Sequence, residues 1–267
     1  MSELPRGAQV GEGVYTTLLW QGGPPATWPL HLARLQRDAA QVGLPPPPLE
    51  TLRQQIDHYL TQCPDPSGQG EPLWRLRIRW WADGGNSLAE PAVGGVLELS
   101  ARALAADERA AGPVRLVTAG PARWPRRWAG AKITSIGEDL AWRHWALGQG
   151  ADDAVLCDAQ GNWSETPTAA LLLGLEDGRL ATPGPDSWPV RSTSLQALAE
   201  RLRALGQPAV AAVRLGPADR AQVRWMLLLN AVIGARPVAE LDGARLQAPP
   251  LALQQLALEL TQPVASK

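Results

Sequence analysis

The sequence contains no phenylalanine, two cysteines and two lysines among its 267 residues. Cys63 and Cys157 stand far apart with no other ligand types beside them, so neither a disulfide framework nor a zinc or other metal site is expected. The N-terminus, MSELPRGAQV, has no apolar core of a signal peptide, and no apolar run approaches the length of a membrane span. These absences predict a soluble, cytoplasmic protein without a membrane partner.

The sequence also lacks an excess of charge of either sign. The net charge is −1, the pI is about 6.3, and arginines alternate with acidic residues along the chain. A polyanion-binding surface needs segregated basic residues, so no nucleic-acid partner is expected. With 45% apolar residues, the chain is long enough to bury a core in one large domain or two smaller ones.

The residues that are present show a bias. There are twelve tryptophans, and all but two of the 25 Lys and Arg residues are arginines, as nucleotide bias toward G and C would produce. Four clustered tryptophans are expected to fill the core: Trp80, Trp81, Trp142 and Trp145. The bias does not explain Lys132, the one lysine besides Lys267. Lysine can lose its proton and attack a carbonyl to form a Schiff base, whereas arginine stays charged. A surface lysine that escaped the bias is the alternative.

Hydrophobic periodicity predicts a first α/β half, with strands at 13–20, 74–81 and 95–102, helices at 28–44 and 49–62, and a connector at 103–111. Alternation places Arg75, Arg77 and Arg79 on one strand face. A second half begins with a strand at 113–120 and a helix at 137–148. Hairpins at 153–166 and 169–183, a helix at 192–206 and three short apolar runs after residue 208 complete it.

Four segments in order resemble the class IV family of pyridoxal-phosphate enzymes: RGAQVGEGVYTT (6–17), HLARLQRDA (31–39), AGAKITS with GADDAVLCDAQGNWSETPTAALLL (150–173), and LLLNAVIGARPVAELDG (227–243). The resemblance implies a two-domain α/β fold of the branched-chain aminotransferase-like or D-amino acid aminotransferase-like kind, fold type IV. The domains would be residues 1–107 and a larger part, 108–267, that carries the Schiff-base lysine. It also implies bound pyridoxal 5′-phosphate at the domain interface, a small-molecule substrate and a homodimer.

Within the family, AGAK and the Asn-Ala pair of LLNAVIGARPV are most similar to the aminodeoxychorismate lyases, which make 4-aminobenzoate for folate synthesis. The resemblance makes Lys132 the Schiff-base residue, Glu165 the partner of the pyridinium nitrogen and Arg34 a phosphate ligand. For Glu165 the alternative is a solvated residue at a strand end. His31, three residues before Arg34, is expected to be a structural partner on the same helix face.

Other residues follow from the same resemblance. Ser192 or Thr193 would bind phosphate at a helix N-terminus, where an ordinary N-cap is the alternative reading. Asn230 and Ala231 would lie near the phosphate or the substrate. Thr17 stands where the lyases carry a hydroxyl that assists elimination. Arg79 and Tyr15 would meet the substrate, Arg79 through a carboxylate.

Three departures from the family pattern stand out: one N-terminal strand fewer, Ala170 in place of Asn, and Trp80 in place of Gly. They leave open a remodelled rim of the site or a loss of activity. The alternatives are therefore a class IV transaminase acting on branched-chain or D-amino acids, and a non-catalytic relative that binds the cofactor or a partner protein.

Overall fold

The computed structural model describes residues 4–64, 72–84, 89–109, 112–123 and 127–263, and the statements below concern these residues. Contacts divide the chain into two compact units. The first comprises Met1–Ala106, Ala131–Ser135 and Gln262–Lys267, and the second comprises Asp107–Gly130 and Ile136–Thr261. Lys132 was expected in the larger C-terminal part, but its short segment, Ala131–Ser135, groups by contacts with the first unit.

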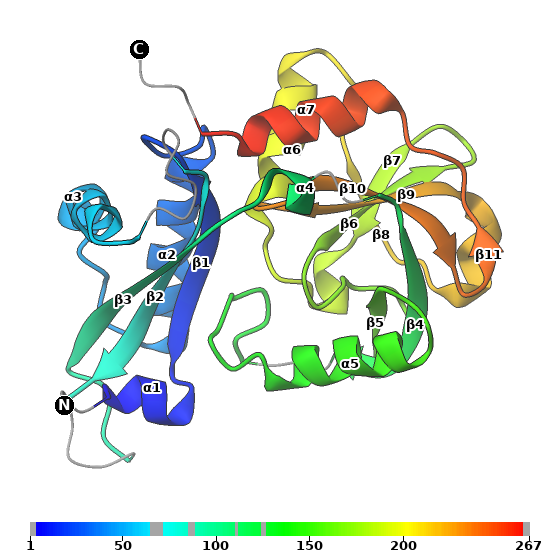
Figure 1. The fold of residues 1–267 in the computed structure, drawn as a ribbon. Coiled ribbons are helices and arrows are strands. Elements are labelled where there is room, and N and C mark those ends of the chain that lie inside the picture. The colour runs from blue at the N-terminus through cyan, green and yellow to red at the C-terminus, as the bar shows by residue number, and fades with distance from the viewer. Residues whose placement is uncertain (1–3, 65–71, 85–88, 110–111, 124–126, 264–267) are drawn as a thin grey trace. The chain divides into compact units, whose positions relative to one another are not determined.

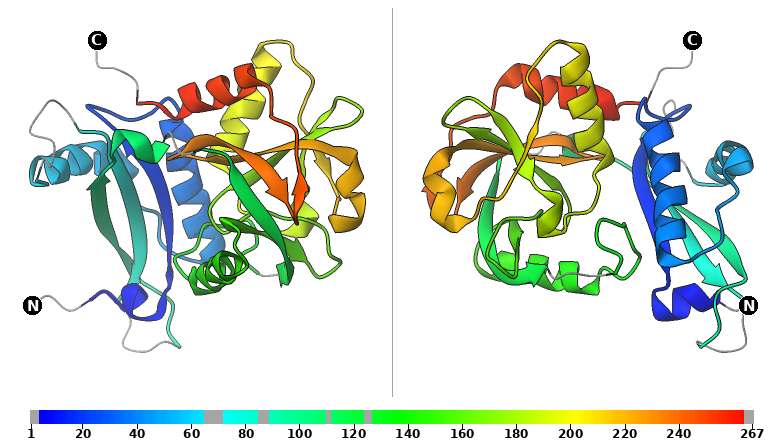
Figure 2. Two further views of the ribbon diagram at one scale, coloured as in Figure 1. Left: turned by 45° about the vertical axis from the view of Figure 1, so that its right-hand side comes forward. Right: turned by 180° about the vertical axis from the view of Figure 1, so that it is seen from behind.

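The first unit is a three-stranded antiparallel sheet with helices on one face. Its strands are β1 (Gly13–Trp20), β2 (Trp74–Asp83) and β3 (Gly94–Ala103), in that order. A short helix, α1 (Arg6–Val10), precedes them, and α2 (Trp28–Val42) and α3 (Leu49–Thr61) cover the sheet (Figures 1 and 2). Side chains from the strands and from both helices, including Val14, Leu35, Ile56 and Ile78, form one buried cluster. The opposite face of β2 carries the arginines, as the alternation predicted.

The second unit is built on an eight-stranded mixed sheet of order β5-β4-β10-β9-β6-β7-β8, with β11 paired to β10. The strands are β4 (Val114–Arg123), β5 (Asp153–Asp158), β6 (Ala170–Leu175), β7 (Leu180–Pro183), β8 (Ala211–Val213), β9 (Val223–Asn230), β10 (Gly234–Leu241) and β11 (Ala244–Arg245). The helices are α4 (Ala106–Arg109), which joins the units, α5 (Gly137–Gly148), α6 (Thr193–Ala204) and α7 (Leu251–Thr261), with 3-10 turns at Pro185–Ser187 and Pro217–Gln222.

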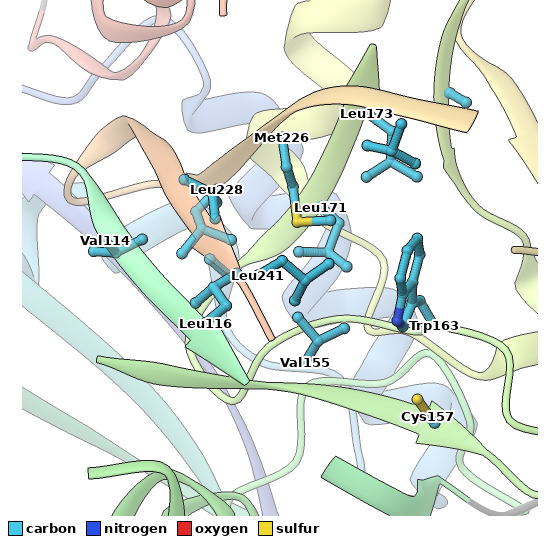
Figure 3. Close-up of a cluster of buried hydrophobic side chains, with 14 of the residues drawn as sticks. Val114, Leu116, Val155, Cys157, Trp163, Leu171, Leu173, Met226, Leu228 and Leu241 are labelled. Carbon is cyan, nitrogen blue, oxygen red and sulfur yellow. The ribbon is translucent and has the colours of Figure 1, made fainter. Parts of the chain in front are cut away.

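This sheet curls around its own core. Val155 of β5 and Leu171 of β6 share one buried cluster although three strands separate them in the sheet order (Figure 3). The other face of β6 and β9 packs through Leu172 and Leu227 against α6 and α7. Strands buried on both faces read as continuous apolar runs, which is why LLL recurs in both. Cys157 lies in the curled core, where burial raises the pKa of its thiol to about 12.

The tryptophans follow the core prediction only in part. Trp80 is buried, but Trp145 is 38% exposed on α5, so the prediction was wrong for that residue. Only Ala146 of α5 is buried, because this helix packs on β4 and β5 mainly through Ala146 and the partly buried Trp142. The sequence did not predict three of the helices: α1, α7 and α4, which lies in the expected connector. Within the described ranges, no helix is long and apolar enough to cross a lipid bilayer.

Candidate functional site

The lysine segment lies along the free edge of β1. The peptide N–H of Tyr15 donates to the Lys132 carbonyl at 3.0 Å, and that of Thr134 donates to the Gly13 carbonyl at 2.9 Å. Val14 and Ile133 form an antiparallel bridge between these bonds. Three residues of the segment, Lys132 to Thr134, are therefore held against β1 through their backbone, and the sheet determines where the lysine stands.

Both peptide groups of Lys132 are fixed, while its amine reaches over an aromatic ring. The Lys132 N–H donates to Asp38 Oδ2 at 2.8 Å, and Nζ lies 4.7 Å from the centroid of the Tyr15 ring. Asp38 is 1% exposed and its other oxygen pairs with Arg37 at 2.7 Å. Asp38 was not among the residues that the sequence predicted for the site. Its position four residues after Arg34, hence on the same helix face, was the available signal.

A buried polar cluster joins α2 to β1 beside this segment. Arg34 donates to Thr16 Oγ1, and Thr16 Oγ1 lies 2.6 Å from His31 Nδ1, with all three side chains at most 5% exposed. Because Arg34 is only a donor and Nη2 also lies 3.3 Å from Nδ1, that ring nitrogen is the acceptor and the ring is neutral. Burial, with Arg34 and Lys132 nearby, lowers the pKa of His31 well below its usual value. His31 thus has the structural role predicted for it.

Arg34 is a buried cation, and it has no direct ion-pair partner in the part of the chain that the structure describes. Burial lowers its pKa to about 10, so the guanidinium stays protonated at neutral pH. Among the described residues no carboxylate lies within ion-pair distance of it, and its buried Nε has no hydrogen-bond partner. A buried cation of this kind fits an anion such as a phosphate.

The face of β1 that carries Tyr15 also carries Thr17, opposite the arginines of β2. Thr17 pairs in register with Arg77, and Arg77 Nε donates to Thr17 Oγ1 at 3.3 Å. Arg79, the arginine that the resemblance favoured, pairs with Glu98 at 2.8 Å. Lys132, Arg34, Thr17, Tyr15 and Arg79 therefore all belong to the first unit.

Trp80 points to the opposite face of β2. Its ring lies over Gly95 of β3, and its Nε1 donates to the Pro45 carbonyl at 2.8 Å. The side chain of Trp80, which departs from the family pattern, therefore packs in the core beneath α2 and α3. It does not change the face of the sheet that carries Thr17 and Arg77.

In the second unit, Glu165 is 6% exposed, which excludes the solvated alternative. It follows β5 on the return arm of the predicted hairpin, which makes a single bridge, Cys157 to Trp163, rather than a full strand. The Glu165 carbonyl accepts from Leu156 N–H at 2.8 Å, so the backbone beneath the carboxylate is fixed.

The N-terminus of α6 carries three consecutive hydroxyl residues. Ser192 is the N-cap, and its Oγ accepts from Leu195 N–H at 3.2 Å. Thr193 and Ser194 are buried, and Ser194 Oγ has no hydrogen-bond partner among the described residues. The ordinary N-cap is confirmed, and the free amides of the first turn with the Ser194 hydroxyl also suit an anion. Ser194 was not singled out earlier, although the run Ser-Thr-Ser was a signal.

Asn230 ends β9 with its side chain engaged in the turn to β10. Oδ1 accepts from Val232 N–H at 2.9 Å and from Ile233 N–H at 2.8 Å, and Nδ2 donates to the Thr168 carbonyl at 3.1 Å. Its side chain therefore orders the turn that presents Ala231. Ala170, which replaces the family's Asn, is buried at the start of β6.

Residues 13–241, most of the chain, match the family described as Amino-transferase class IV. This chain belongs to that family. It is 30% identical over 253 residues to a bifunctional aminodeoxychorismate lyase / D-amino acid transaminase of Mycobacterium tuberculosis. The alignment covers 91% of this chain and 86% of that protein.

Solved structures share the fold of this chain. A hypothetical aminotransferase from Mycobacterium tuberculosis, in its PLP-bound form, superposes with a TM-score of 0.80 at 25% identity, covering 98% of this chain and 94% of the other. The fold IV-transaminase CpuTA1 from Curtobacterium pusillum gives 0.78 at 24% identity, covering 97% and 88%. The predicted fold class, the two-part α/β fold of type IV, is confirmed.

Proposed function

We propose that this class IV enzyme is a 4-amino-4-deoxychorismate lyase, which converts its substrate to 4-aminobenzoate and pyruvate and so serves folate synthesis. The observation that carries the proposal is the setting of Lys132: both its peptide groups are fixed, and its amine extends over Tyr15 beside the buried polar cluster that contains the Arg34 cation. A relative of 30% identity is described with this lyase activity.

Pyridoxal phosphate is the cofactor of this enzyme, and the residues fit it. Arg34 offers a buried guanidinium without a carboxylate partner among the described residues, and the α6 N-terminus offers amides and the Ser194 hydroxyl. Both are donor sets for a phosphate. Lys132 would hold the cofactor covalently, and Glu165 would keep a proton on its ring nitrogen. When bound, pyridoxal phosphate supplies an electron sink that stabilises a carbanion at the substrate carbon.

The remaining steps are proton movements by this chain's own groups. The Lys132 amine would take the proton from the amine-bearing ring carbon of the substrate. Thr17 would donate a proton to the oxygen of the departing enolpyruvyl group, which leaves as the enol of pyruvate while the ring becomes aromatic. Thr17 can donate because Arg77 Nε occupies a lone pair of its oxygen and leaves the hydroxyl hydrogen available.

A transaminase acting on D-amino acids is the second candidate, because the relative of 30% identity is described with both activities. A branched-chain amino acid is the other substrate class that the resemblance left open. All of these reactions begin with the same proton abstraction. They differ in the next step, since a transaminase needs a keto acid as second substrate and a lyase does not.

The test is to supply aminodeoxychorismate, generated enzymatically, to the cofactor-loaded protein without any keto acid. We expect 4-aminobenzoate and pyruvate in equal amounts. Lys132→Arg is the control, because a guanidinium cannot hold the cofactor covalently, and it should abolish both the products and the borohydride-fixed cofactor on the Lys132 peptide.

Two results would count against the proposal. If D-alanine or a branched-chain amino acid is rapidly converted to its keto acid and no aminobenzoate forms, the enzyme is a transaminase. If the cofactor is fixed only to Lys267 or the N-terminus, Lys132 is a surface lysine and the site is elsewhere.

A further inference from the structure

Three arginines, Arg75, Arg77 and Arg79, share one face of β2. Arg77 and Arg79 differ in whether a carboxylate of this chain already pairs with the guanidinium. Arg79 is balanced: Nη1 donates to Glu98 Oε1 at 2.8 Å and to Ser100 Oγ at 3.2 Å. The second oxygen of Glu98 accepts from Trp81 Nε1 at 2.5 Å, so this carboxylate is held in place on both sides. A guanidinium already paired in this way has little to offer an incoming anion.

Arg77 is different. Its Nε donates to Thr17 Oγ1 at 3.3 Å, and its guanidinium carbon lies 5.1 Å from the centroid of the Tyr15 ring. Among the described residues, no carboxylate pairs with Arg77 and no acceptor is bound by its two terminal nitrogens. Those nitrogens form the edge of the guanidinium that binds a carboxylate through two parallel hydrogen bonds.

Tyr15 places this free edge near the reactive amine. Its ring has Lys132 Nζ at 4.7 Å and the Arg77 guanidinium carbon at 5.1 Å, so the two cations can be no further apart than these two distances together. One aromatic ring with para substituents can span such a separation. The ring of an aminobenzoate carries its amine and its carboxylate in that relation.

We propose that Arg77, rather than Arg79, binds a carboxylate of the substrate. Tyr15 and Thr17 fix the guanidinium from two sides, so the carboxylate is received by a preorganised group while the substrate amine is directed toward Lys132. The inference rests on the proposed function only in that the substrate carries both an amine and a carboxylate. That is also true of the amino acids a transaminase would use.

The experiment compares ligands that differ only in this charge. Calorimetric titration of the cofactor-loaded protein with 4-aminobenzoate and with the neutral 4-aminobenzamide gives a ratio of affinities. In the wild type we expect the acid to bind at least about tenfold more tightly, as a charge-assisted bidentate pair allows. In Arg77→Gln the ratio should fall to about one, and Arg77→Lys should restore part of it, because charge returns without the planar fork.

Arg79→Gln and Arg75→Gln are the matched controls, since each removes one positive charge from the same strand face and should keep the ratio. Loss of the ratio in Arg79→Gln and its persistence in Arg77→Gln would overturn the proposal. Equal weakening of acid and amide in Arg77→Gln would also overturn it, because that pattern indicates a purely structural role.

A second pair, D-alanine and D-alaninamide, followed by the change in cofactor absorbance, separates this inference from the lyase assignment. If the wild type binds D-alanine more tightly than its amide but does not prefer 4-aminobenzoate over its amide, the lyase proposal fails. The role of Arg77 is then decided by the effect of Arg77→Gln on the affinity ratio of D-alanine to D-alaninamide. If the wild type prefers the acid in neither pair, Arg77 does not bind a carboxylate.

Discussion

The position and protonation of Lys132 and its neighbours depend on the groups around them as well as on the residue type. The backbone of Lys132 is held by Asp38 and by β1, and its side-chain amine lies over the ring of Tyr15. Arg34 and His31 lie in the same interior, where one is a buried cation and the other is kept neutral. The neutral histidine has a consequence for stability that can be measured.

His31 makes the folded state weaker below neutral pH. Its pKa in the folded protein is lowered by burial, whereas in the unfolded chain it is about 6.5, so acid protonates the unfolded state first. The free energy of unfolding should therefore fall as the pH drops below about 6.5, by on the order of 1 kcal/mol at pH 5.5 from this group. Urea unfolding at pH 7.5 and pH 5.5 measures it.

His31→Asn should remove this part of the pH dependence, although it lowers stability at both pH values. The matched control is His144→Asn, which changes an exposed histidine of α5 and should leave the dependence as it is. If wild type and His31→Asn lose the same free energy between the two pH values, the histidine is not neutral in the folded protein.

Single elements show how a chain without phenylalanine packs tryptophan into sheets. Trp80 lies over Gly95 on β3, and Trp225 on β9 lies over Gly174 on β6. A Cβ added at Gly95 would stand 2.2 Å from the Trp80 ring, and one at Gly174 would stand 2.0 Å from the Trp225 ring. Each large ring therefore depends on a glycine across the strands.

Gly95→Ala and Gly174→Ala should each lower the free energy of unfolding by about 1–3 kcal/mol, because a ring held in a packed core has to move. Gly94→Ala is the control, since a Cβ at this neighbouring position of β3 meets no atom within 4 Å. Chemical denaturation measures all three. In Trp80→Leu, Gly95→Ala should cost less, and an unchanged cost would mean that the ring is not what excludes the methyl group.

At the scale of the whole molecule, the resemblance to the class IV family leads us to expect a homodimer. Light scattering coupled to gel filtration should give about twice the chain mass of 28.6 kDa for the cofactor-loaded protein. The unloaded protein and Lys132→Arg are the comparisons, because they separate assembly from cofactor attachment. A mass of one chain at micromolar concentration would contradict the expectation.

Local sequence was enough for most elements. The predicted bounds of β1 and α5 agree with the structure, and the N-cap of α6 was found at Ser192, because periodicity, capping and turn residues act within a few positions. The same local signals gave the arginine face of β2. They also gave Lys132, Arg34 and Glu165 as candidates through their motifs, and the latter two proved buried despite their charge.

Only the tertiary structure decided which residues and strands contact one another. Asp38 holds a peptide group 94 residues away, β4 lies between β5 and β10, and Arg79 is balanced by Glu98 on the next strand while Arg77 is not. No local pattern could supply these facts, because which strands become neighbours depends on the free energy of the whole packed chain. A residue's charge, protonation and reach toward a ligand follow from those neighbours. The sequence alone could therefore offer candidates for the reactive residues, but not the groups that hold and balance them.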